Sequence, residues 1–198
     1  SASDIDEDDL TFTVESYSAN ISVDIVENQL TMIPALDFNG TAQIMVTVTD
    51  GILFDEEIFQ LNVTPVNDAP VLAAIADMST AEDTPLTITL SASDVDVDNL
   101  SFTVESDNEP VDVEIVAGSL LIMTPSLNYN GSVNITVTVS DGFLTDEGSF
   151  ALTITPVNDA PVLTDPSAQF TDEDTPLAIT LSASDVENND LTYSAVSD

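Results

Sequence analysis

Acidic side chains recur in this sequence at a fixed spacing that could hold a metal ion. Asp94, Asp96 and Asp98 alternate along the stretch DVDVD, and Asp185 and Glu187 repeat the alternation 91 residues later. In an extended loop, this spacing lets alternate carboxylates converge on one cation. A solvated acidic turn is the alternative interpretation. Recurrence of the pattern in a chain without basic residues favours the cation site.

The composition restricts the kind of cation. The chain contains 37 Asp and Glu residues and no Lys, Arg, His or Cys, which gives a net charge of −37. Zinc and copper prefer nitrogen or sulfur ligands, which these side chains do not supply. Calcium takes about six to eight oxygen ligands from carboxylates, amides and carbonyls. The sequence therefore predicts Ca²⁺ as the bound ion, with magnesium as the weaker alternative.

The same charge restricts the partners. Affinity for nucleic acid comes from Lys and Arg that neutralise phosphates, and anionic lipid headgroups repel a polyanion. No run of about 18 apolar residues is present. With 43% hydrophobic residues, the chain is nevertheless too apolar for a disordered acidic tail. We expect a folded protein with no nucleic-acid partner and no membrane insertion in this segment.

Long internal repeats divide the chain. TPVNDAPVL occurs at residues 64–72 and 155–163, and SASD begins at residues 1, 91 and 182. A spacing of 90 or 91 residues is typical of tandem domains and too long for a solenoid repeat. The predicted domains are a partial repeat at 1–66 without its N-terminal part, a complete repeat at 67–157 and a truncated repeat at 158–198. We expect the chain to be a piece of a longer polypeptide.

Period-two hydrophobicity predicts the fold class. Within residues 67–157, apolar and polar residues alternate in short stretches rich in Val, Ile and Thr, which is typical of half-buried strands. The expected strands are 71–75, 86–90, 100–104, 111–115, 120–123, 133–139 and 150–154. Turn residues separate them. The sequence therefore predicts an all-β protein of tandem seven-stranded Greek-key β-sandwiches of the immunoglobulin-like kind.

An EF-hand loop is a second interpretation of the same acids. Asp94, Asp96 and Asp98, with Glu105 at the twelfth place, nearly match its spacing. Asn99, however, occupies the sixth place, where that loop needs glycine. The flanking residues also alternate as strands, which puts Glu105 on a solvent-facing side. We reject the EF-hand.

The linker between repeats carries oxygen ligands of its own. Asn67 and Asp68 lie between Pro65 and Pro70, which stiffen the backbone and remove donors. In a sandwich with alternating strand directions, this linker lies near the Asp94 loop of the following repeat. We therefore expect oxygens from two domains and a linker to meet at one junction.

These motifs, taken in order, resemble cadherin repeats, and more closely the cadherin-like tandem modules of large bacterial surface proteins. VNDAP is similar to the cadherin linker, DVD and DVE to the DxD loop, and LDFN and LNYN stand at the place of the DRE-type turn. Glu in EDTPL matches the first-strand glutamate, and the Asp of each DG turn matches the Asp before glycine. Asn39 and Asn130 stand where the DRE-type turn of cadherins has an acidic residue, so we expect fewer calcium ions per junction than in cadherins.

The resemblance implies two calcium junctions. The first would use Asp37, Asn39, Asn67, Asp68, Asp94, Asp96 and Asp141. The second would use Glu82, Asn130, Asn158, Asp159, Asp185 and Glu187. Asp4, Asp6 and Asp50 would face a preceding repeat, and Glu173 would face a following one.

The leading functional hypothesis is a calcium-rigidified spacer or adhesive segment of a large extracellular, cell-surface or fibre-forming protein. Its partners would be calcium ions, neighbouring repeats of the same polypeptide and homophilic or other cell-surface contacts. The alternative is a carbohydrate- or protein-binding β-sandwich whose acidic surface is only an adaptation to high salt, as in halophilic proteins. The chain has no Trp, three Tyr and eight Phe, most of the Phe at core-phase positions, which argues against exposed aromatic platforms. Paired carboxylates could hydrolyse glycosides, but no aromatic cleft is evident, so we expect no enzymatic activity.

Overall fold

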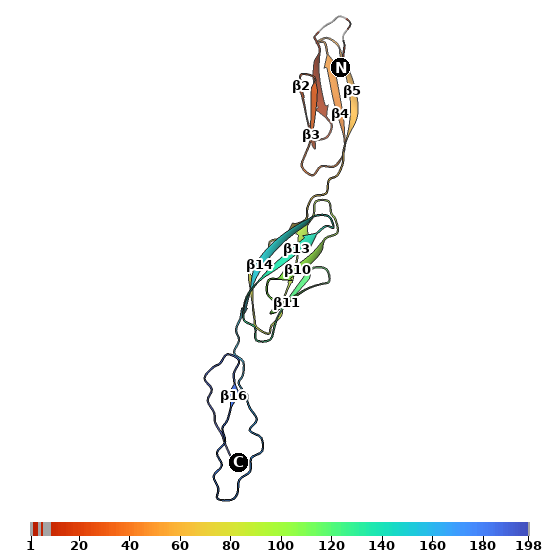
Figure 1. Cartoon of the computed structure of the whole chain (residues 1–198). Helices are drawn as coiled ribbons and strands as arrows, with labels where there is room; N and C mark the ends of the chain where they lie inside the picture. The colour runs from red at the N-terminus through yellow and green to blue at the C-terminus, as the bar shows by residue number, and fades with distance from the viewer. Residues whose placement is uncertain (1, 4, 6–8, 198) are drawn as a thin grey trace. The chain divides into compact units, whose positions relative to one another are not determined.

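A computed structural model describes residues 2–3, 5 and 9–197, and these residues form strands, turns and bends without a helix (Figure 1). None of the described residues lies in a helix long and apolar enough to cross a membrane. The chain splits into two compact units, Ser1–Asp68 and Ala69–Asp198. We call them the first unit and the second unit and describe each by itself.

The first unit contains five strands among its described residues, in two sheets. They are β1 (Thr11–Ser16), β2 (Ile21–Val26), β3 (Gln29–Pro34), β4 (Gly40–Thr49) and β5 (Phe54–Val63). One sheet has the order β1-β4-β5 and the other consists of β2 and β3, with every neighbouring pair antiparallel.

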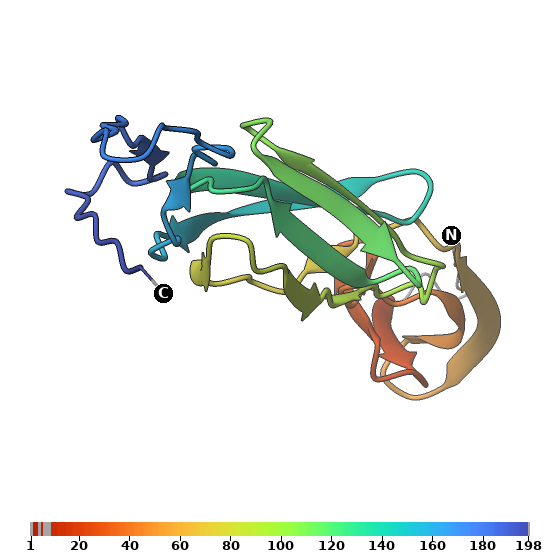
Figure 2. The ribbon, with the colours of Figure 1, turned by 90° about the horizontal axis from the view of Figure 1, so that it is seen from below.

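The second unit begins with a complete β-sandwich, built from nine strands. They are β6 (Val71–Leu72), β7 (Met78–Ala81), β8 (Leu86–Thr89), β9 (Ala92–Ser93), β10 (Ser101–Ser106), β11 (Val111–Val116), β12 (Leu120–Pro125), β13 (Gly131–Ser140) and β14 (Thr145–Thr155). The main sheets have the orders β10-β13-β14-β7 and β11-β12-β8, and β6 pairs with β9. Their green to blue-green colours can be followed in Figure 2. The all-β sandwich fold is therefore confirmed, but the structure adds two short strands, β7 and β9, to the seven that the alternation predicted.

The remainder of the second unit, residues 158–198, is called the C-terminal segment. It has two short strands among its described residues, β15 (Val162–Leu163) and β16 (Ala183–Ser184), which pair antiparallel. Residues 164–182, all of which are described, form no strand. The pair repeats β6 and β9 one period later, down to the hydrogen bond from Thr164 N–H to the Ser182 carbonyl at 2.9 Å.

The core of the complete sandwich consists of the inward-facing residues of both sheets. Leu121, Met123, Ile135 and Leu152 are fully buried. Each is flanked in sequence by more exposed residues, because successive side chains of a strand point to opposite faces. Burial of each such side chain stabilises the fold by about 1.5 to 3 kcal/mol. The sandwich thus obtains its core from strands far apart in sequence.

The core of the first unit is smaller. Its fully enclosed members are Ile21, Ala42 and Ile44, with half-buried residues such as Leu61 and Val63 packed against them. Within the described residues, this unit has no counterparts of β7 and β8, the strands that pair with β14 and β12 in the complete sandwich. Among the described residues, β5 and β3 therefore lack the outer partners that β14 and β12 have in the complete sandwich.

The start of the complete sandwich differs from the sequence prediction. The expected strand 71–75 is reduced to β6, and a separate strand, β7, follows. β6 pairs antiparallel with β9, whereas β7 pairs parallel with β14, with Met78 opposite Leu152. The chain therefore contributes to both layers in turn. The sequence around β7 shows no period-two alternation, so this strand could not be predicted from the pattern. Its position is defined by parallel pairing with β14.

One glycine is required by close packing. Gly131 follows the turn before β13 with φ +151, and a Cβ there would lie 2.9 Å from Tyr129 Oη. Tyr129 packs against the core of the sandwich. Glycine is therefore needed at the first residue of β13 for two reasons: the backbone has a positive φ, and Tyr129 leaves no room for a Cβ.

Candidate cation site

Three carboxylates from separate segments come together in the second unit. Their oxygen atoms in Glu82, Asp159 and Glu187 all lie within 4.8 Å of one another. Glu82 follows β7, Asp159 lies between β14 and β15, and Glu187 follows β16. We call this group the three-segment cluster. All three residues belong to the set that the resemblance implied for the second junction.

Strand pairing places Glu82. Its N–H donates to the Thr155 carbonyl at 2.9 Å, which continues the β7–β14 ladder by one residue. Its Oε1 accepts the N–H of Val157 at 2.5 Å. The residue is only 4% exposed, an unusual position for an acidic side chain. The carboxylate is therefore held in place at the end of the sandwich where β14 leads into the C-terminal segment.

Asp159 and Glu187 are held next to each other. The N–H of Asp159 donates to Glu187 Oε2 at 3.3 Å. The Oδ2 atom of Asp159 is buried and has no hydrogen-bond partner among the described residues. A buried carboxylate oxygen without a donor is unfavourable, and neighbouring carboxylates increase that cost. The cluster thus has the composition and geometry of a site for a hard cation.

The loop around Glu187 is organised by Asp185. Its Oδ1 accepts the N–H groups of Glu187 at 3.1 Å and Asn189 at 3.0 Å. Asn189 Nδ2 in turn donates to Asn158 Oδ1 at 3.0 Å, and Asn158 Nδ2 donates to the Asp159 carbonyl at 2.7 Å. Sequence reasoning missed Asn189. The signal was available, because Asn189 occupies the place of Asp98 one repeat earlier.

The turn that contains Asn130 is connected to the turn that contains Glu82. Asn128 N–H donates to Asp83 Oδ1 at 2.8 Å, and both residues have positive φ, +56 and +59. Asn130 itself is exposed. The LNYN turn is therefore fixed next to EDTPL by a residue, Asp83, that sequence reasoning did not select.

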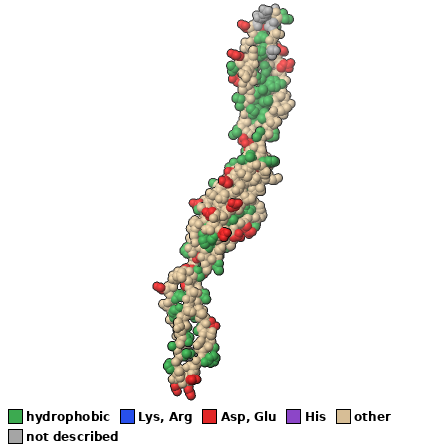
Figure 3. Space-filling model, viewed as in Figure 1, with side chains coloured by type: hydrophobic (Ala, Val, Ile, Leu, Met, Phe, Trp, Pro, Cys, Tyr) green, Lys and Arg blue, Asp and Glu red, His purple; other side chains and the backbone are tan. Residues whose placement is uncertain are grey.

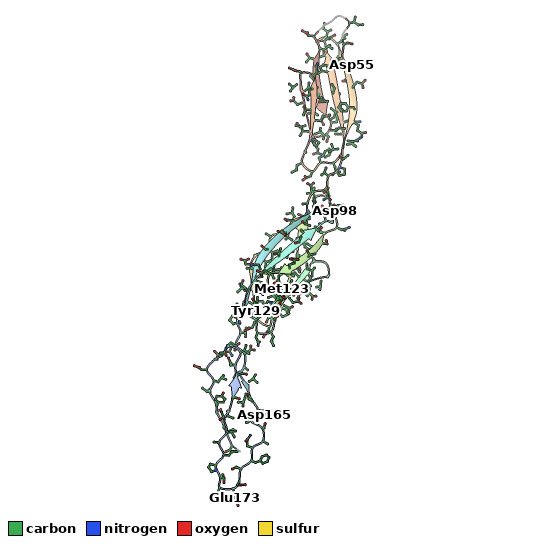
Figure 4. The ribbon with its side chains drawn as sticks, in the orientation of Figure 1. Asp55, Asp98, Met123, Tyr129, Asp165 and Glu173 are labelled. Atoms are coloured by element: carbon green, nitrogen blue, oxygen red, sulfur yellow. The ribbon has the colours of Figure 1, made fainter. Side chains whose placement is uncertain are left out.

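A second acidic group lies in the loop after β9. Carboxylate oxygens of Asp94, Asp96 and Asp98 lie within 4.8 Å of one another. Asp94 Oδ1 accepts the N–H groups of Asp96 at 2.8 Å and Asp98 at 3.4 Å, while its Oδ2 is buried without a hydrogen-bond partner among the described residues. Figure 4 shows Asp98 and Tyr129 at opposite ends of the sandwich. The DVDVD loop and the LNYN turn therefore mark its two ends.

The Asp residues before glycine stabilise their own turns. Asp141 is 8% exposed, and its Oδ1 accepts the N–H groups of Phe143 at 2.6 Å and Leu144 at 2.7 Å. In the first unit, Asp50 accepts the equivalent bonds from Ile52 and Leu53, both at 2.7 Å. The Leu53 N–H, followed by the Ile52 N–H, holds the pKa of the Asp50 carboxyl below its usual value. One oxygen of each carboxylate is thus engaged in turn geometry.

The set implied for the first junction is divided between the two units. Asp37, with φ +57, and Asn39 lie in an exposed turn of the first unit. Asn67 Nδ2 donates to the Asp68 carbonyl at 3.2 Å in the same unit. Asp94, Asp96 and Asp141 belong to the second unit. This junction stays a prediction.

Three further residues implied by the resemblance have different outcomes. Asp4 and Asp6 lie outside the described residues. Glu173 is exposed in a turn of the C-terminal segment and is labelled in Figure 4. Glu105 is exposed on β10, as the rejection of an EF-hand required. The expectation that most Phe residues lie at core positions holds for only half of the eight, since Phe54, Phe59, Phe143 and Phe170 are 69%, 39%, 85% and 89% exposed.

No side chain of the chain can neutralise these acids, because Lys, Arg and His do not occur in the sequence. Figure 3 accordingly shows scattered red carboxylates and no blue or purple on the visible face. Charge compensation must come from solvent ions or a partner.

Two family models match consecutive parts of the chain. Residues 1–64 match the cadherin-like domain, and residues 67–154 match the bacterial Ig domain. Domains of these two kinds usually lie in extracellular or surface proteins and are typically not enzymes.

A curated relative and two solved structures are similar to the chain. Chitinase A from Pseudoalteromonas piscicida is 30% identical over 157 residues, which is 77% of this chain and 19% of that protein, so the chain spans about a fifth of its relative. An endo-fucoidan hydrolase of glycoside hydrolase family 107 aligns over 77% of this chain and 24% of its own, with 19% identity and a TM-score of 0.37.

The first two domains of human protocadherin-24 give a closer structural match. They align over 77% of this chain and 84% of their own, with 16% identity and a TM-score of 0.51. This likeness shows the fold. The two family models bear out the resemblance in part of the chain each: residues 1–64 are similar to cadherin-like domains, and residues 67–154 are similar to bacterial Ig domains.

Proposed function

We propose that the chain is a calcium-rigidified spacer or adhesive segment of an extracellular or cell-surface protein. The three-segment cluster carries this proposal, because it gathers Glu82, Asp159 and Glu187 within 4.8 Å without any basic residue nearby in sequence or space. Glu82 belongs to the sandwich, whereas Asp159 and Glu187 belong to the C-terminal segment. An ion bound there would therefore fix the segment to the sandwich.

Electrostatics supplies the physical reason. Two carboxylates about 4 Å apart repel by roughly 1 kcal/mol in water and by about 4 kcal/mol at an effective dielectric constant near 20. Burial of Glu82 and of Asp159 Oδ2 moves the cluster toward the larger value. Calcium supplies two positive charges and accepts oxygen ligands in irregular geometry. The ion would convert a repulsive contact into a bridge.

The repeat period extends the proposal to the other boundary. The equivalents of Asp159 and Glu187 one repeat earlier are Asp68 and Asp96. We propose that these residues, with the remaining members of the first-junction set, bind calcium in the same way. Millimolar affinity is usual for extracellular modules and would suffice outside cells. The domains would be the repeats 1–66, 67–157 and 158–198.

The experiment compares small-angle scattering and thermal unfolding of the whole chain in calcium and in excess chelator. We expect calcium to narrow the distribution of interatomic distances obtained from scattering and to raise the unfolding temperature. A double variant, Asp159→Asn with Glu187→Gln, should lose most of this difference. The matched control, Asp112→Asn with Glu114→Gln, changes one Asp and one Glu on the exposed face of β11 and should keep it.

The halophilic alternative gives a different result in the same experiment. If sodium chloride at equal ionic strength reproduces the whole effect of calcium, the acids act only through general screening. Identical scattering and identical unfolding with calcium and with chelator would also remove the proposal.

A second candidate function is supported by a separate observation. The relative named chitinase A contains a segment 30% identical to this chain, and exposed aromatic side chains such as Phe143 and Phe170 are available for stacking on sugars. The chain would then be an accessory module of a polysaccharide-degrading enzyme. Retention on insoluble chitin, weakened by Phe143→Ala and Phe170→Ala, is the expected result. Equal retention of both variants and the unaltered chain would argue against it.

A further inference from the structure

Within the complete sandwich, the chain passes from the β6–β9 pair to the sheet that contains β14 through residues 73–77, which we call the crossing segment. β6 pairs with β9, whereas β7 pairs with β14 only from Leu152 to Thr155. The strand β14 begins at Thr145. Among the described residues, the edge of β14 from Thr145 to Ala151 therefore lacks a strand partner on the side of β7.

The hydrogen bonds at the end of this edge show which backbone groups face the gap. Ala151 N–H donates to Asp77 Oδ1 at 2.8 Å. Asn134, the cross-strand partner of Ala151, has its own N–H and carbonyl bonded to the residue after β10. Ala151 therefore directs its backbone groups away from β13. Because alternate residues of a strand point the same way, Ser149 and Glu147 also direct their N–H and carbonyl groups toward the gap.

A pocket of about 240 Å³ lies in this gap, between β14 and the crossing segment. Its lining includes Ala73, Ala74 and Ile75 on one side and Glu147 and Ser149 on the other. The two alanines are exposed and short, so the crossing segment does not fill the space. The pocket therefore has an aliphatic wall that faces backbone oxygens and one acidic residue.

Two aspartates hold the crossing segment in place. Leu72 N–H donates to Asp146 Oδ2 at 2.8 Å at one end, and the bond between Ala151 and Asp77 closes the other end. Between them the Leu72 side chain packs against Gly148, where a Cβ would lie 3.1 Å from Leu72 Cδ2. The separation between the crossing segment and β14 is therefore fixed by the fold at both ends.

The sequence of the crossing segment is specific to this repeat. Residues 64–72 recur without change at 155–163, but the following five residues read AAIAD at 73–77 and TDPSA at 164–168. Asp77, which holds one end of the segment, is replaced by Ala168. The aliphatic wall and its aspartate therefore belong to this repeat alone and are not part of the common repeat pattern.

We propose that this pocket receives a lysine side chain from a partner protein. Lysine lays its aliphatic stem on apolar surface and keeps its charged group among polar atoms. The stem would lie against Ala73, Ala74 and Ile75. The ammonium group carries three donors and would meet the carboxylate of Glu147 and the carbonyl of Ser149.

Charge complementarity identifies the occupant. Glu147 lines the pocket, Asp77 and Asp146 hold the crossing segment at its two ends, and the chain has no Lys or Arg to neutralise them. A neutral apolar side chain would leave the oxygens of the pocket without donors. A second copy of this chain has no basic side chain to offer, so the lysine comes from a different protein. The site uses no residue of the three-segment cluster, and the inference does not depend on calcium.

The first test titrates the whole chain with a short blocked peptide that has lysine at its centre and follows the backbone amide resonances, in moderate salt and excess chelator. The control peptide has norleucine in place of lysine, which keeps the aliphatic stem and removes the charge. We expect saturable shifts centred on Ala74 and Ser149, and at least about tenfold weaker binding of the norleucine peptide. Equal binding of the two peptides, or shifts spread over the acidic surface without saturation at these residues, would overturn the proposal.

A larger side chain in the pocket tests its place. Ala74→Leu changes an exposed residue, so it fills the pocket without entering the core. We expect the affinity for the lysine peptide to fall at least about tenfold, because the leucine occupies the place of the lysine stem. The matched control, Ala76→Leu, makes the same change at an exposed position of the crossing segment outside the pocket lining and should keep the affinity. Unchanged binding by Ala74→Leu would rule out this pocket as the site.

A charge substitution tests the role of the carboxylate. Glu147→Gln removes the charge at the pocket, and we expect it to weaken binding of the lysine peptide by about threefold to tenfold while binding of the norleucine peptide stays the same. The matched control, Glu114→Gln, changes an exposed acid on β11 and should leave both unchanged. Equal effects of the two substitutions would show that only the overall charge of the chain attracts the peptide, which would contradict the proposal.

Discussion

The complete sandwich and the first unit carry apolar residues at many equivalent strand positions but bury them to different extents. Leu152 is fully buried in β14, and its equivalent in β5, Leu61, is only half-buried. Phe150 is 3% exposed and Phe59 is 39% exposed. The register of β13 with β14 is the same as that of β4 with β5, so the hairpin itself does not cause the difference.

The difference arises from two strands. β7 and β8 cover the edges of β14 and β12 in the complete sandwich, and the described part of the first unit has no equivalent. An alternating hairpin therefore defines which side chains point inward, whereas burial depends on strands that pair with it from elsewhere. Equivalent substitutions in the two regions should separate these contributions.

The largest expected effect is in the core. Leu152→Ala should destabilise the complete sandwich by about 2 to 5 kcal/mol, because it leaves a cavity in a fully buried site. Leu61→Ala should cost less than half of that in the first unit, since solvent already reaches the side chain. Urea unfolding followed separately by fluorescence probes in each unit measures both. Equal losses would show that the first unit is as well covered as the sandwich.

The next effect concerns the two glutamates of EDTPL. Glu82→Gln should weaken calcium binding by at least about tenfold, equivalent to about 1.4 kcal/mol, because a buried ligand charge is lost. Glu173→Gln should change binding little, because Glu173 is exposed in the C-terminal segment. Calcium titration by calorimetry compares the two variants. If both substitutions lowered the calcium affinity equally, the assignment of Glu82 as a calcium ligand in the three-segment cluster would be wrong.

A smaller effect is expected at the two turn glycines. Gly131→Ala puts a Cβ 2.9 Å from Tyr129 Oη at φ +151, whereas Gly40→Ala, at φ +128, meets Phe38 at 3.9 Å. Both variants lose backbone freedom, but only the first also creates a clash. We expect Gly131→Ala to cost about 1 kcal/mol more than Gly40→Ala. Thermal unfolding of each variant against the unaltered chain tests this order.

The smallest effect is the acid sensitivity of the Asp50 turn. Hydrogen bonds from Leu53 and Ile52 place the folded pKa of Asp50 below the ordinary value of 3.8. The stabilisation is therefore fully present above that value and is lost as the pH falls through the folded pKa. Asp50→Asn should remove this dependence, as followed by amide resonances of the turn between pH 5 and about pH 2. An Asp50 titration at or above 3.8 would contradict the assignment.

Much of the second-junction set could be selected from sequence because the motifs that contain it resemble those of cadherin repeats. Glu82, Asp159 and Glu187 were all in that set, and the structure brings their carboxylates together. Asp83 and Asn189 were not selected. Their roles depend on hydrogen bonds to Asn128 and Asn158, which lie 45 and 31 residues away in sequence. Spacing along one strand does not reveal such contacts.

Local alternation and composition were enough to predict the all-β class, the repeat period, the inward face of each long strand and the restriction to oxygen ligands. Three features came from the folded arrangement alone: β6 and β7 join different sheets, Glu82 is buried beside two acids of the C-terminal segment, and equivalent hairpins differ in burial. These features depend on pairing between strands that are distant in sequence, because this pairing determines which side chains lose contact with water.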